Sequence, residues 1–355
     1  MPLPRTLPYL QRYLVEEVVE DYREALLPRR ELIRRVLTIT GSIPATAAVL
    51  LQMGCGTTNQ PGAGGGSAAG LAASASPATT GAPTMIPSPV ITISSTASDS
   101  VASSSASGET AGTASGVTVS PSDPAIDAAT VEFPGKAGML KGYRSTPKAT
   151  AKAPGLLVIH ENLGLTDHIK DVTRRYAKAG YLTVAVDLVS RQGGTDQYAD
   201  SAQVTGTLGQ AKQADLLQDL LSGLDYLKGL PAFAGPKAGV VGYCFGGGLT
   251  WLLAINSGDL AAAIPYYGPP PQPLDDVQKI TAAVLAFYGG KDTRITSGEP
   301  AMQAAMQKYH KTFEYMIYPE ASHAFNRDTG PSYDPAAAKD AYSRSLAWLQ
   351  KYLRA

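Results

Sequence analysis

Apolar and polar positions follow a regular order through the second two-thirds of this chain. Short, nearly continuous apolar runs, such as GLLVIH at 155–160 and AAVLAFY at 282–288, predict buried strands. Longer segments with apolar positions three or four residues apart, such as 209–229, predict amphipathic helices. This alternation favours an α/β fold, with a mostly parallel sheet covered by helices on both faces. Reactive side chains of such a sheet lie at the carboxyl ends of its strands.

The other elements of this domain follow the same pattern. An antiparallel start is expected over 130–144. Further strands are expected at 181–188, 238–243, 261–267 and 313–318, and further helices at 167–179, 245–256, 299–309 and 335–353. Together they place one folded domain at 126–355, which is long enough to bury a single α/β core.

The stretch 56–125 lacks this periodicity. It contains no aromatic residue, no Lys and no Arg, and its only charged residues are Asp99, Glu109 and Asp123. Gly, Ser, Thr, Ala and Pro make up nearly all of the rest. Such a composition cannot bury enough apolar surface to offset the entropy of ordering, so a disordered, flexible tether is predicted.

Residues 1–55 have the character of a targeting segment. The motif PRRELIR at 28–34 resembles a twin-arginine export signal, and a weakly apolar run follows at 36–51. Gly54-Cys55 then resembles a lipoprotein cleavage site, although Gln52 stands where Leu is preferred. We expect export and lipidation at Cys55, with the protein on the outer face of the cytoplasmic membrane or in the cell envelope. The alternatives are an uncleaved anchor or cleavage elsewhere. An amphipathic helix is expected over 9–27, as an extended n-region.

Charge and cysteine content narrow the function. The chain has 30 Lys and Arg against 30 Asp and Glu, and no basic cluster is interleaved with aromatics, so nucleic acid is not an expected partner. Contact with a membrane is expected only through the signal or the lipid. The only cysteines are Cys55 and Cys244, which makes a structural disulfide improbable and leaves Cys244 as a free thiol.

Cys244 lies in the sequence GYCFG at 242–246, between a predicted strand and a predicted helix. This is the G-x-S-x-G arrangement of a nucleophile elbow, with sulfur in place of oxygen. The glycines leave room for a strained turn, and the helix N-terminus is expected to favour the thiolate. The alternative is a small buried cysteine at a tight crossing.

A nucleophile needs a base, and the base needs a residue that orients it. Asp292 follows the strand at 282–288 and His323 follows the strand at 313–318, in the nucleophile, acid, histidine order of α/β-hydrolases. Taken singly, they could be a turn aspartate and a loop histidine. The backbone N–H groups of Asn162 and Phe245 are expected to form the oxyanion hole. Glu161 beside that hole would handle the thiol proton.

The motifs HENLGL, GYCFGG, GGKD and SHAF together resemble the dienelactone hydrolase (carboxymethylenebutenolidase) family over essentially all of 126–355. The resemblance implies an α/β-hydrolase fold and a Cys-His-Asp triad that opens an enol-lactone through an acyl-thioester, without metal or cofactor. It also implies that Glu161 takes the thiol proton when substrate arrives. The two arginines that hold the substrate carboxylate would be Arg191 and Arg327.

The export signal and the tether depart from the compact members of this family, which leaves the substrate open. We expect a monomeric hydrolase of small carboxylate-bearing esters or enol-lactones. One alternative is a broad carboxylesterase or thioesterase. Another, from a different class, is a surface-displayed binding protein on an inactive hydrolase scaffold.

Overall fold

The structure is a computed structural model that describes residues 7–52 and 118–353. The strands are β1 Ile126–Gly135, β2 Gly138–Pro147, β3 Ala153–Ile159, β4 Leu182–Val186, β5 Phe233–Tyr243, β6 Leu260–Tyr266, β7 Ala283–Gly289 and β8 Phe313–Tyr318. The helices are α1 Tyr9–Arg23, α2 Arg29–Thr40, α3 Ile43–Gln52, α4 Asp167–Lys178, α5 Ser201–Gln210, α6 Gln213–Gly229, α7 Phe245–Asn256, α8 Thr293–Thr296, α9 Glu299–Lys308 and α10 Pro335–Leu353.

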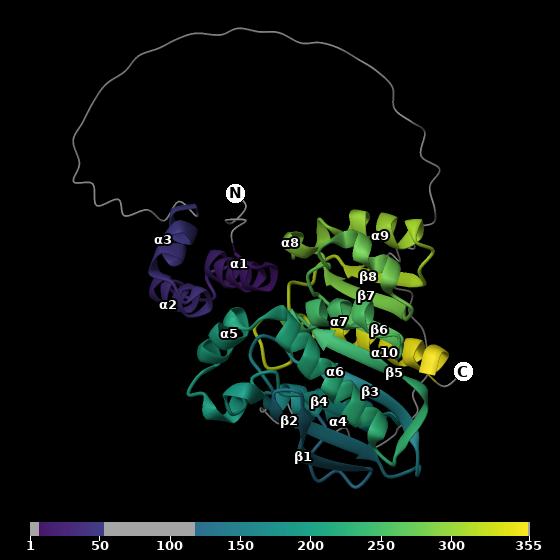
Figure 1. The fold of residues 1–355 in the computed structure, drawn as a ribbon. Coiled ribbons are helices and arrows are strands. Elements are labelled where there is room, and N and C mark those ends of the chain that lie inside the picture. Colours follow the sequence, from purple (N-terminus) through teal and green to yellow (C-terminus); the bar gives the residue numbers. More distant parts are fainter. Residues whose placement is uncertain (1–6, 53–117, 354–355) are drawn as a thin grey trace, which may run out of the picture. The chain divides into compact units, whose positions relative to one another are not determined.

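The strands form one sheet in the order β1-β2-β4-β3-β5-β6-β7-β8, with helices on both faces (Figure 1). β2 pairs antiparallel with β1 and with β4, and the remaining neighbours pair in parallel. β4 and β7 are buried along their whole length, as strands covered on both faces must be. The predicted α/β-hydrolase fold is confirmed.

The helices begin where the sequence offers caps. The Thr166 side chain accepts the Ile169 N–H at the start of α4, and Asp200 does the same for Gln203 at the start of α5. Several boundaries differ from the sequence-based expectation; for example, the strand expected from 238 is β5, which begins at Phe233. The helix predicted over 209–229 is α6, which begins at Gln213, because the preceding helix α5 extends to Gln210 before the chain turns.

Helices α1–α3 belong to the same compact unit as the sheet. The helix expected over 9–27 is α1, which buries one apolar face that includes Leu14 and Val18. α2 packs closely on α5, where a methyl group on Gly206 would lie 2.1 Å from Thr38 Cγ2. None of the described helices combines the length and apolarity needed to cross a membrane.

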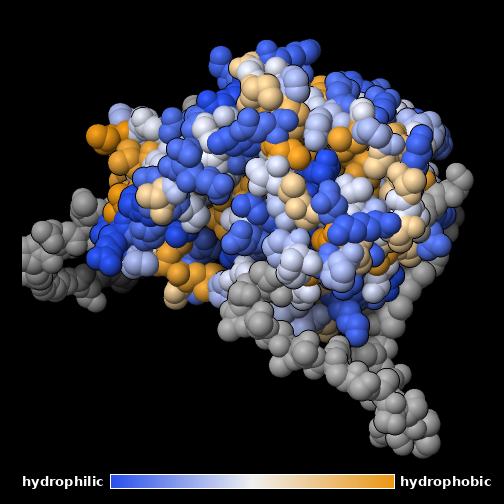
Figure 2. All heavy atoms as spheres, turned by 90° about the horizontal axis from the view of Figure 1, so that it is seen from below, coloured by the Kyte–Doolittle hydropathy of each residue, from blue (hydrophilic) through white to orange (hydrophobic). Residues whose placement is uncertain are grey.

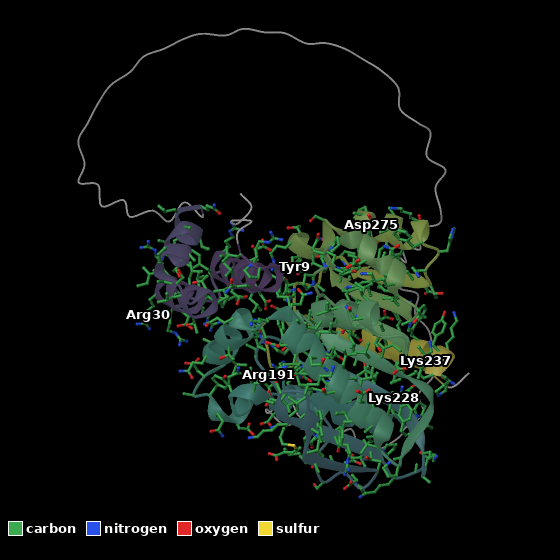
Figure 3. The ribbon with its side chains drawn as sticks, in the orientation of Figure 1. Tyr9, Arg30, Arg191, Lys228, Lys237 and Asp275 are labelled. Atoms are coloured by element: carbon green, nitrogen blue, oxygen red, sulfur yellow. The ribbon has the colours of Figure 1, made fainter. Side chains whose placement is uncertain are left out.

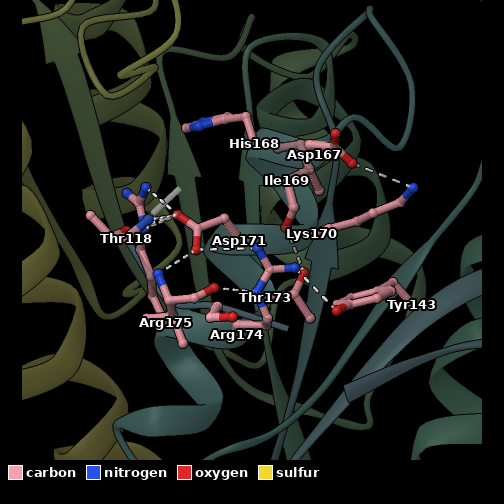
Figure 4. Close-up of polar contacts among 12 residues, drawn as sticks. Thr118, Tyr143, Asp167, His168, Ile169, Lys170, Asp171, Thr173, Arg174 and Arg175 are labelled. Carbon is pink, nitrogen blue, oxygen red and sulfur yellow. Dashed lines mark hydrogen bonds and ion pairs between the residues drawn. The ribbon is translucent and has the colours of Figure 1, made fainter. Parts of the chain in front are cut away.

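The end of the predicted tether makes specific contacts. Asp171, which is fully buried on α4, accepts the backbone N–H groups of Thr118 and Val119 at 3.0 and 2.8 Å (Figure 4). Arg174 donates from its Nε to the Val119 carbonyl at 2.5 Å. Within 118–353, packing therefore begins at 118, eight residues before β1. Residues 53–117, which hold Cys55 and most of the predicted tether, lie outside the described residues.

Large hydrophobic side chains are unevenly exposed. The face drawn in Figure 2 carries mainly hydrophilic side chains, with hydrophobic ones in small groups between them. Four of the six large exposed hydrophobics of the described residues lie in the segment of α1–α3, and Ile43 at 75% and Leu51 at 67% are the most exposed. The apolar surface left open is thus concentrated in the part that resembles a signal core.

Candidate active site

Cys244 occupies the sharp turn between β5 and α7. Its backbone has φ 56° and ψ −120°, a conformation that costs free energy for a residue with a side chain. The neighbouring backbone leaves no space for side chains, since a Cβ on Gly242 would lie 2.2 Å from the Gly246 carbonyl oxygen. A Cβ on Gly246 would lie 2.4 Å from the His160 carbonyl oxygen. The turn therefore has the geometry of a nucleophile elbow.

His323 and Asp292 form a hydrogen-bonded pair at the same edge of the sheet. Asp292 follows β7, His323 follows β8, and His323 Nδ1 lies 2.5 Å from Asp292 Oδ2. Burial alone opposes the imidazolium, but the charge and hydrogen bond of Asp292 outweigh it and raise the pKa of His323. Burial likewise opposes the Asp292 carboxylate, yet His323 and Arg294 lower its pKa. The pair is suited to hold and release a proton at the second imidazole nitrogen.

The loop after β3 is held in place by His160. Its Nδ1 donates to the Glu161 carbonyl at 2.6 Å, while Nε2 accepts the Leu188 N–H at 3.0 Å. The Asn162 carbonyl accepts the Thr205 hydroxyl, and Asn162 lines the cavity above Cys244. The Phe245 N–H lies against the Cys244 sulfur, which lines the same cavity, and acts to lower the pKa of the thiol. Both expected oxyanion-hole residues therefore adjoin the cavity that holds the thiol.

The thiol of Cys244 contacts a helix that sequence reasoning did not connect to it. Cys244 Sγ lies 3.3 Å from both carboxylate oxygens of Glu17 on α1. The Tyr13 hydroxyl, also on α1, lies 3.4 Å from Cys244 Sγ and 3.4 Å from His323 Nε2. The Tyr13 side chain of α1 thus reaches both the sulfur and the imidazole.

These surroundings correct the expectation of a thiolate. Burial, and then the carboxylates of Glu17 and Glu161, raises the pKa of Cys244 well above its ordinary value. The helix N-terminus is present at α7, but desolvation and two nearby negative charges outweigh it. In this arrangement Cys244 is a protonated thiol that donates to Glu17.

Glu161 and Arg327 face each other at the floor of the site. Glu161 is 2% exposed, and its Oε2 lies 3.8 Å from Arg327 Nη1. Its other carboxylate oxygen, Oε1, is buried and has no hydrogen-bond partner among the described residues. Glu161 therefore has an unused acceptor close to the thiol, and Arg327 has a charge directed towards the cavity.

The structure does not bring Arg191 to this cavity. Its Nε and Nη2 each lie 2.8 Å from a carboxylate oxygen of Asp219 on α6, and Asp215 accepts a further contact. Figure 3 labels Arg191 beside the teal helices, at some distance from Tyr9 on α1. A guanidinium held in this bidentate way has a structural partner already. Of the two arginines predicted to bind substrate, Arg327 lines this cavity and Arg191 does not.

His168 on α4 is buried, and a loop residue fixes its ring. It is 5% exposed, and its Nδ1 lies 2.8 Å from Asp328 Oδ1. Asp328 also pairs with Arg175, which reaches Asp171 on the same helix (Figure 4). This network fixes the residue next to Arg327, and so fixes the loop that carries it.

A cavity of about 250 Å³ opens above Cys244. The segment of α1 contributes four acidic residues to its lining, and Lys and Arg residues come from the sheet edge and from α2. The acidic lining residues are Glu17, Glu20, Asp21, Glu24, Glu161 and Asp292, and the lining Lys and Arg residues are Arg35, Lys291, Arg294 and Arg327. The acids of α1 therefore face the arginines that would attract an anionic substrate.

Arg294 and Tyr267 are further residues that the motifs did not reveal. The Arg294 guanidinium lies 5.7 Å from the centre of the Tyr13 ring and 3.3 Å from Asp292. The Tyr267 ring meets the His323 ring edge-on at 5.0 Å. The sequence signal for Arg294 was its position two residues after Asp292. The signal for Tyr267 was its position at the end of the strand predicted at 261–267. For Tyr13 and Glu17, the only sequence signal was the amphipathic pattern of their helix.

One group of described residues has donors suited to a transition metal. Glu17, Cys244 and His323 offer ligand atoms that lie within 4.8 Å of one another. All three groups already make the contacts given above with each other or with Tyr13. The arrangement thus accounts for these side chains without an ion.

A nucleophile elbow, a His-Asp pair and a mostly parallel sheet define the class of α/β-hydrolase-fold enzymes. The model of the dienelactone hydrolase family matches residues 140–353, and this chain belongs to that family. A protein of Salmonella typhimurium named “Putative carboxymethylenebutenolidase” is 34% identical over 245 residues, which cover 65% of this chain and 89% of that one. One from Methylorubrum extorquens with the same name is 32% identical, over 66% of this chain and 84% of that one.

Solved structures of other proteins are similar to this chain. A crystal structure from Klebsiella pneumoniae, described as a putative dienelactone hydrolase, has 32% identity and a TM-score of 0.60 over 64% of this chain and all of its own. An acylaminoacyl peptidase from Pyrococcus horikoshii shares the fold at 16% identity, with a TM-score of 0.54 over 64% of this chain and 42% of its own. The chain is a hydrolase of carboxylic esters.

Proposed function

We propose that this hydrolase cleaves small carboxylate-bearing esters or enol-lactones through a Cys-His-Asp triad and an acyl-thioester. The observation that carries the proposal is the meeting of Cys244, His323 and Asp292 at the carboxyl ends of β5, β7 and β8. A bound ester would place its carbonyl carbon at the sulfur and its oxygen at the N–H groups of Phe245 and Asn162.

The steps follow from the groups present. Glu161 takes the thiol proton, and the sulfur attacks the carbonyl to form a tetrahedral oxyanion. Collapse of this intermediate breaks the C–O bond, and the imidazolium of His323 gives its proton to the leaving oxygen. His323 then takes a proton from water, whose oxygen attacks the thioester; the C–S bond breaks, the acid is released, and the sulfur takes back its proton from Glu161. Asp292 keeps the imidazole oriented and stabilises its charge throughout.

Glu161 supplies a route for the first proton. A substrate carboxylate at Arg327 would compete with Glu161 for the guanidinium, because both are anions and they lie on the same side of the cavity. Glu161, released from Arg327, would then accept the thiol proton through its free oxygen. The thiol would thus be activated only when an anionic substrate is bound, in keeping with its raised pKa in the free protein.

The test is hydrolysis by wild type, Cys244→Ala and a matched Cys55→Ser control. The substrates are an aryl acetate, a neutral lactone and a carboxylate-bearing enol-lactone. Cys244→Ala should lose at least about a thousandfold in kcat/KM, as expected for a lost nucleophile, while Cys55→Ser retains the values of the unprocessed wild-type chain. Intact mass should show one acyl group that is absent from Cys244→Ala. A Cys244→Ala enzyme within about tenfold of wild type would rule out the triad. Equal rates on all three substrates would favour the broad carboxylesterase.

A further inference from the structure

We propose that helices α1–α3 are an internal inhibitor, in which α1 occupies the acyl site and α2 holds it in place, so that the unprocessed chain has low activity. This inference rests on the proposed function for the identity of the nucleophile. Its first support is the contact at that nucleophile. Glu17 and Tyr13 of α1 touch Cys244, which is only 2% exposed, and Tyr13 also touches His323.

The position of Tyr13 obstructs the reaction. Its hydroxyl is within 3.4 Å of both the sulfur and the imidazole nitrogen, which is the space that a substrate carbonyl and its leaving oxygen must enter. Arg294 lies over the Tyr13 ring and is itself paired with Asp292, so the tyrosine is held from the catalytic side. A substrate cannot reach the thiol while this side chain is in place.

The charges of α1 also oppose the binding of an anionic substrate. The cavity offers arginines to an anionic substrate, and α1 fills it with its own carboxylates. Asn162 donates to Glu17 at 3.1 Å, and Arg327 and Arg35 both act electrostatically on Asp21. α1 therefore behaves as a competitor that presents the same kind of charge as the substrate.

Residues of α1–α3 and residues of the catalytic part both contribute specific contacts to the surface where they meet. Tyr9 at the start of α1 donates to the Pro270 carbonyl, and Leu10, Leu14 and Val18 are buried. On α5, Gly206 and Gly209 have no side chain where Thr38 and Ile39 of α2 lie, and Gln210 Nε2 donates to the Thr38 carbonyl at 2.7 Å. Arg34 of α2 reaches Asp200 at 3.1 Å. Surface of this kind is typical of a specific interface.

The family does not need these helices for its fold. The match to the family model begins at residue 140, so α1–α3 lie outside it. The predicted cleavage before Cys55 would remove all three helices in one cut. Export processing, as we propose it, would then expose the thiol at the same time as it releases the chain.

The experiment compares three variants in a Cys55→Ser background of the full chain. Gly206→Leu should displace α2 without touching the nucleophile, and Tyr13→Ala/Glu17→Ala removes the contacts at the thiol. Gly229→Leu is the control, because nothing lies within 4 Å of a Cβ at that position. The readouts are the rate of Cys244 alkylation by iodoacetamide, followed by intact mass, and the hydrolysis of an aryl acetate. Thermal melting checks that each variant is folded.

Alkylation of Cys244 should be at least about tenfold faster in both displacing variants than in the control, because the accessible state becomes the major one. Hydrolysis should rise in parallel. Alkylation at the control rate in both variants would overturn the inhibitor. If Gly206→Leu fails to fold, the Tyr13→Ala/Glu17→Ala variant alone decides. Fast alkylation without hydrolysis would support the inhibitor and reject the proposed function. Equal hydrolysis and equal alkylation in every variant would reject the inhibitor and leave the proposed function supported.

Discussion

The protonation of Cys244 depends on opposing influences at a single side chain. The α7 N-terminus and the Phe245 N–H favour the thiolate, whereas burial and the carboxylates of Glu17 and Glu161 favour the thiol. The thiol wins because desolvation acts on the full charge, while a helix terminus contributes only about half a unit charge. Tyr13 and Glu17 of α1 touch the sulfur, so the balance at Cys244 depends on whether the helix is docked.

Arg327 should determine the preference for anionic substrates. Arg327→Met removes a charged donor from the cavity, so the ratio of kcat/KM for an anionic over a neutral aryl ester should fall. The expected loss is roughly ten- to a thousandfold, which corresponds to about 1.5 to 4 kcal/mol of charged hydrogen bonding. Steady-state kinetics on the full chain and on Gly206→Leu measure this ratio.

Arg191→Met is the matched control. Because Asp219 holds that guanidinium away from the cavity, the substrate ratio should stay at the wild-type value while stability falls. An equal fall of the ratio in both variants would show that the effect is one of net charge rather than of a binding site.

The sequence located the residues that follow strands and could not locate the ones that depend on packing. Cys244, Asp292 and His323 each come directly after an apolar run, so their common position follows from parallel pairing. Arg191 also follows a strand, but the partner that turns it aside, Asp219, lies on a helix whose orientation no local pattern specifies. Burial of His168 depends likewise on a loop 160 residues away.

At the scale of elements, α1 shows the limit of periodicity as evidence. The pattern correctly predicted an amphipathic helix with an apolar face. It could not say what that face covers, because Glu17 and Cys244 are separated by 227 positions in the chain. The strands were easier, since continuous apolar runs such as β4 and β7 have few alternatives to burial in a sheet.

Asp21 should make the docking of α1 depend on pH. Burial, and next the Glu17 carboxylate, raises its pKa to about 6, against partial compensation by His323, Arg35 and Arg327. In an undocked chain the pKa would lie near the ordinary value of about 3.9. Neutral Asp21 is therefore favoured in the docked state, so its stabilisation is complete below about pH 4 and is lost as pH rises through about 6.

Asp21→Asn imitates the neutral form and should raise the Tm at pH 7.5 by a few degrees, for roughly 2–3 kcal/mol. The gain should vanish at pH 4, where wild type is also neutral at this position. Thermal melts at the two pH values measure the difference, with the exposed Asp225 on α6 as the control substitution Asp225→Asn. A gain of the same size at both pH values would mean that the charge of Asp21 is not responsible.

At the scale of the molecule, we propose that the chain is exported and attached through Cys55. The wild-type protein should fractionate with membranes after loss of residues 1–54, Cys55→Ala should be released in soluble form outside the cytoplasm, and Arg29→Lys/Arg30→Lys should stay inside uncut. The basis is the twin-arginine-like motif and the exposed apolar side chains around α2 and α3. Fractionation with intact mass measures all three. Equal soluble yields of wild type and Cys55→Ala would exclude the lipid anchor but not export.

The covalent link between α1–α3 and the catalytic part has a consequence for reversibility. Two groups joined through one chain meet at an effective concentration on the order of a millimolar, so even a weak fit can keep the site filled. A cut anywhere in 53–117 turns this into an encounter between two separate molecules, diluted to whatever the cell supplies. The helices would then dissociate and not return, and a peptide of residues 7–52 added at micromolar levels would not inhibit the cut enzyme. Activation by cleavage would therefore be irreversible.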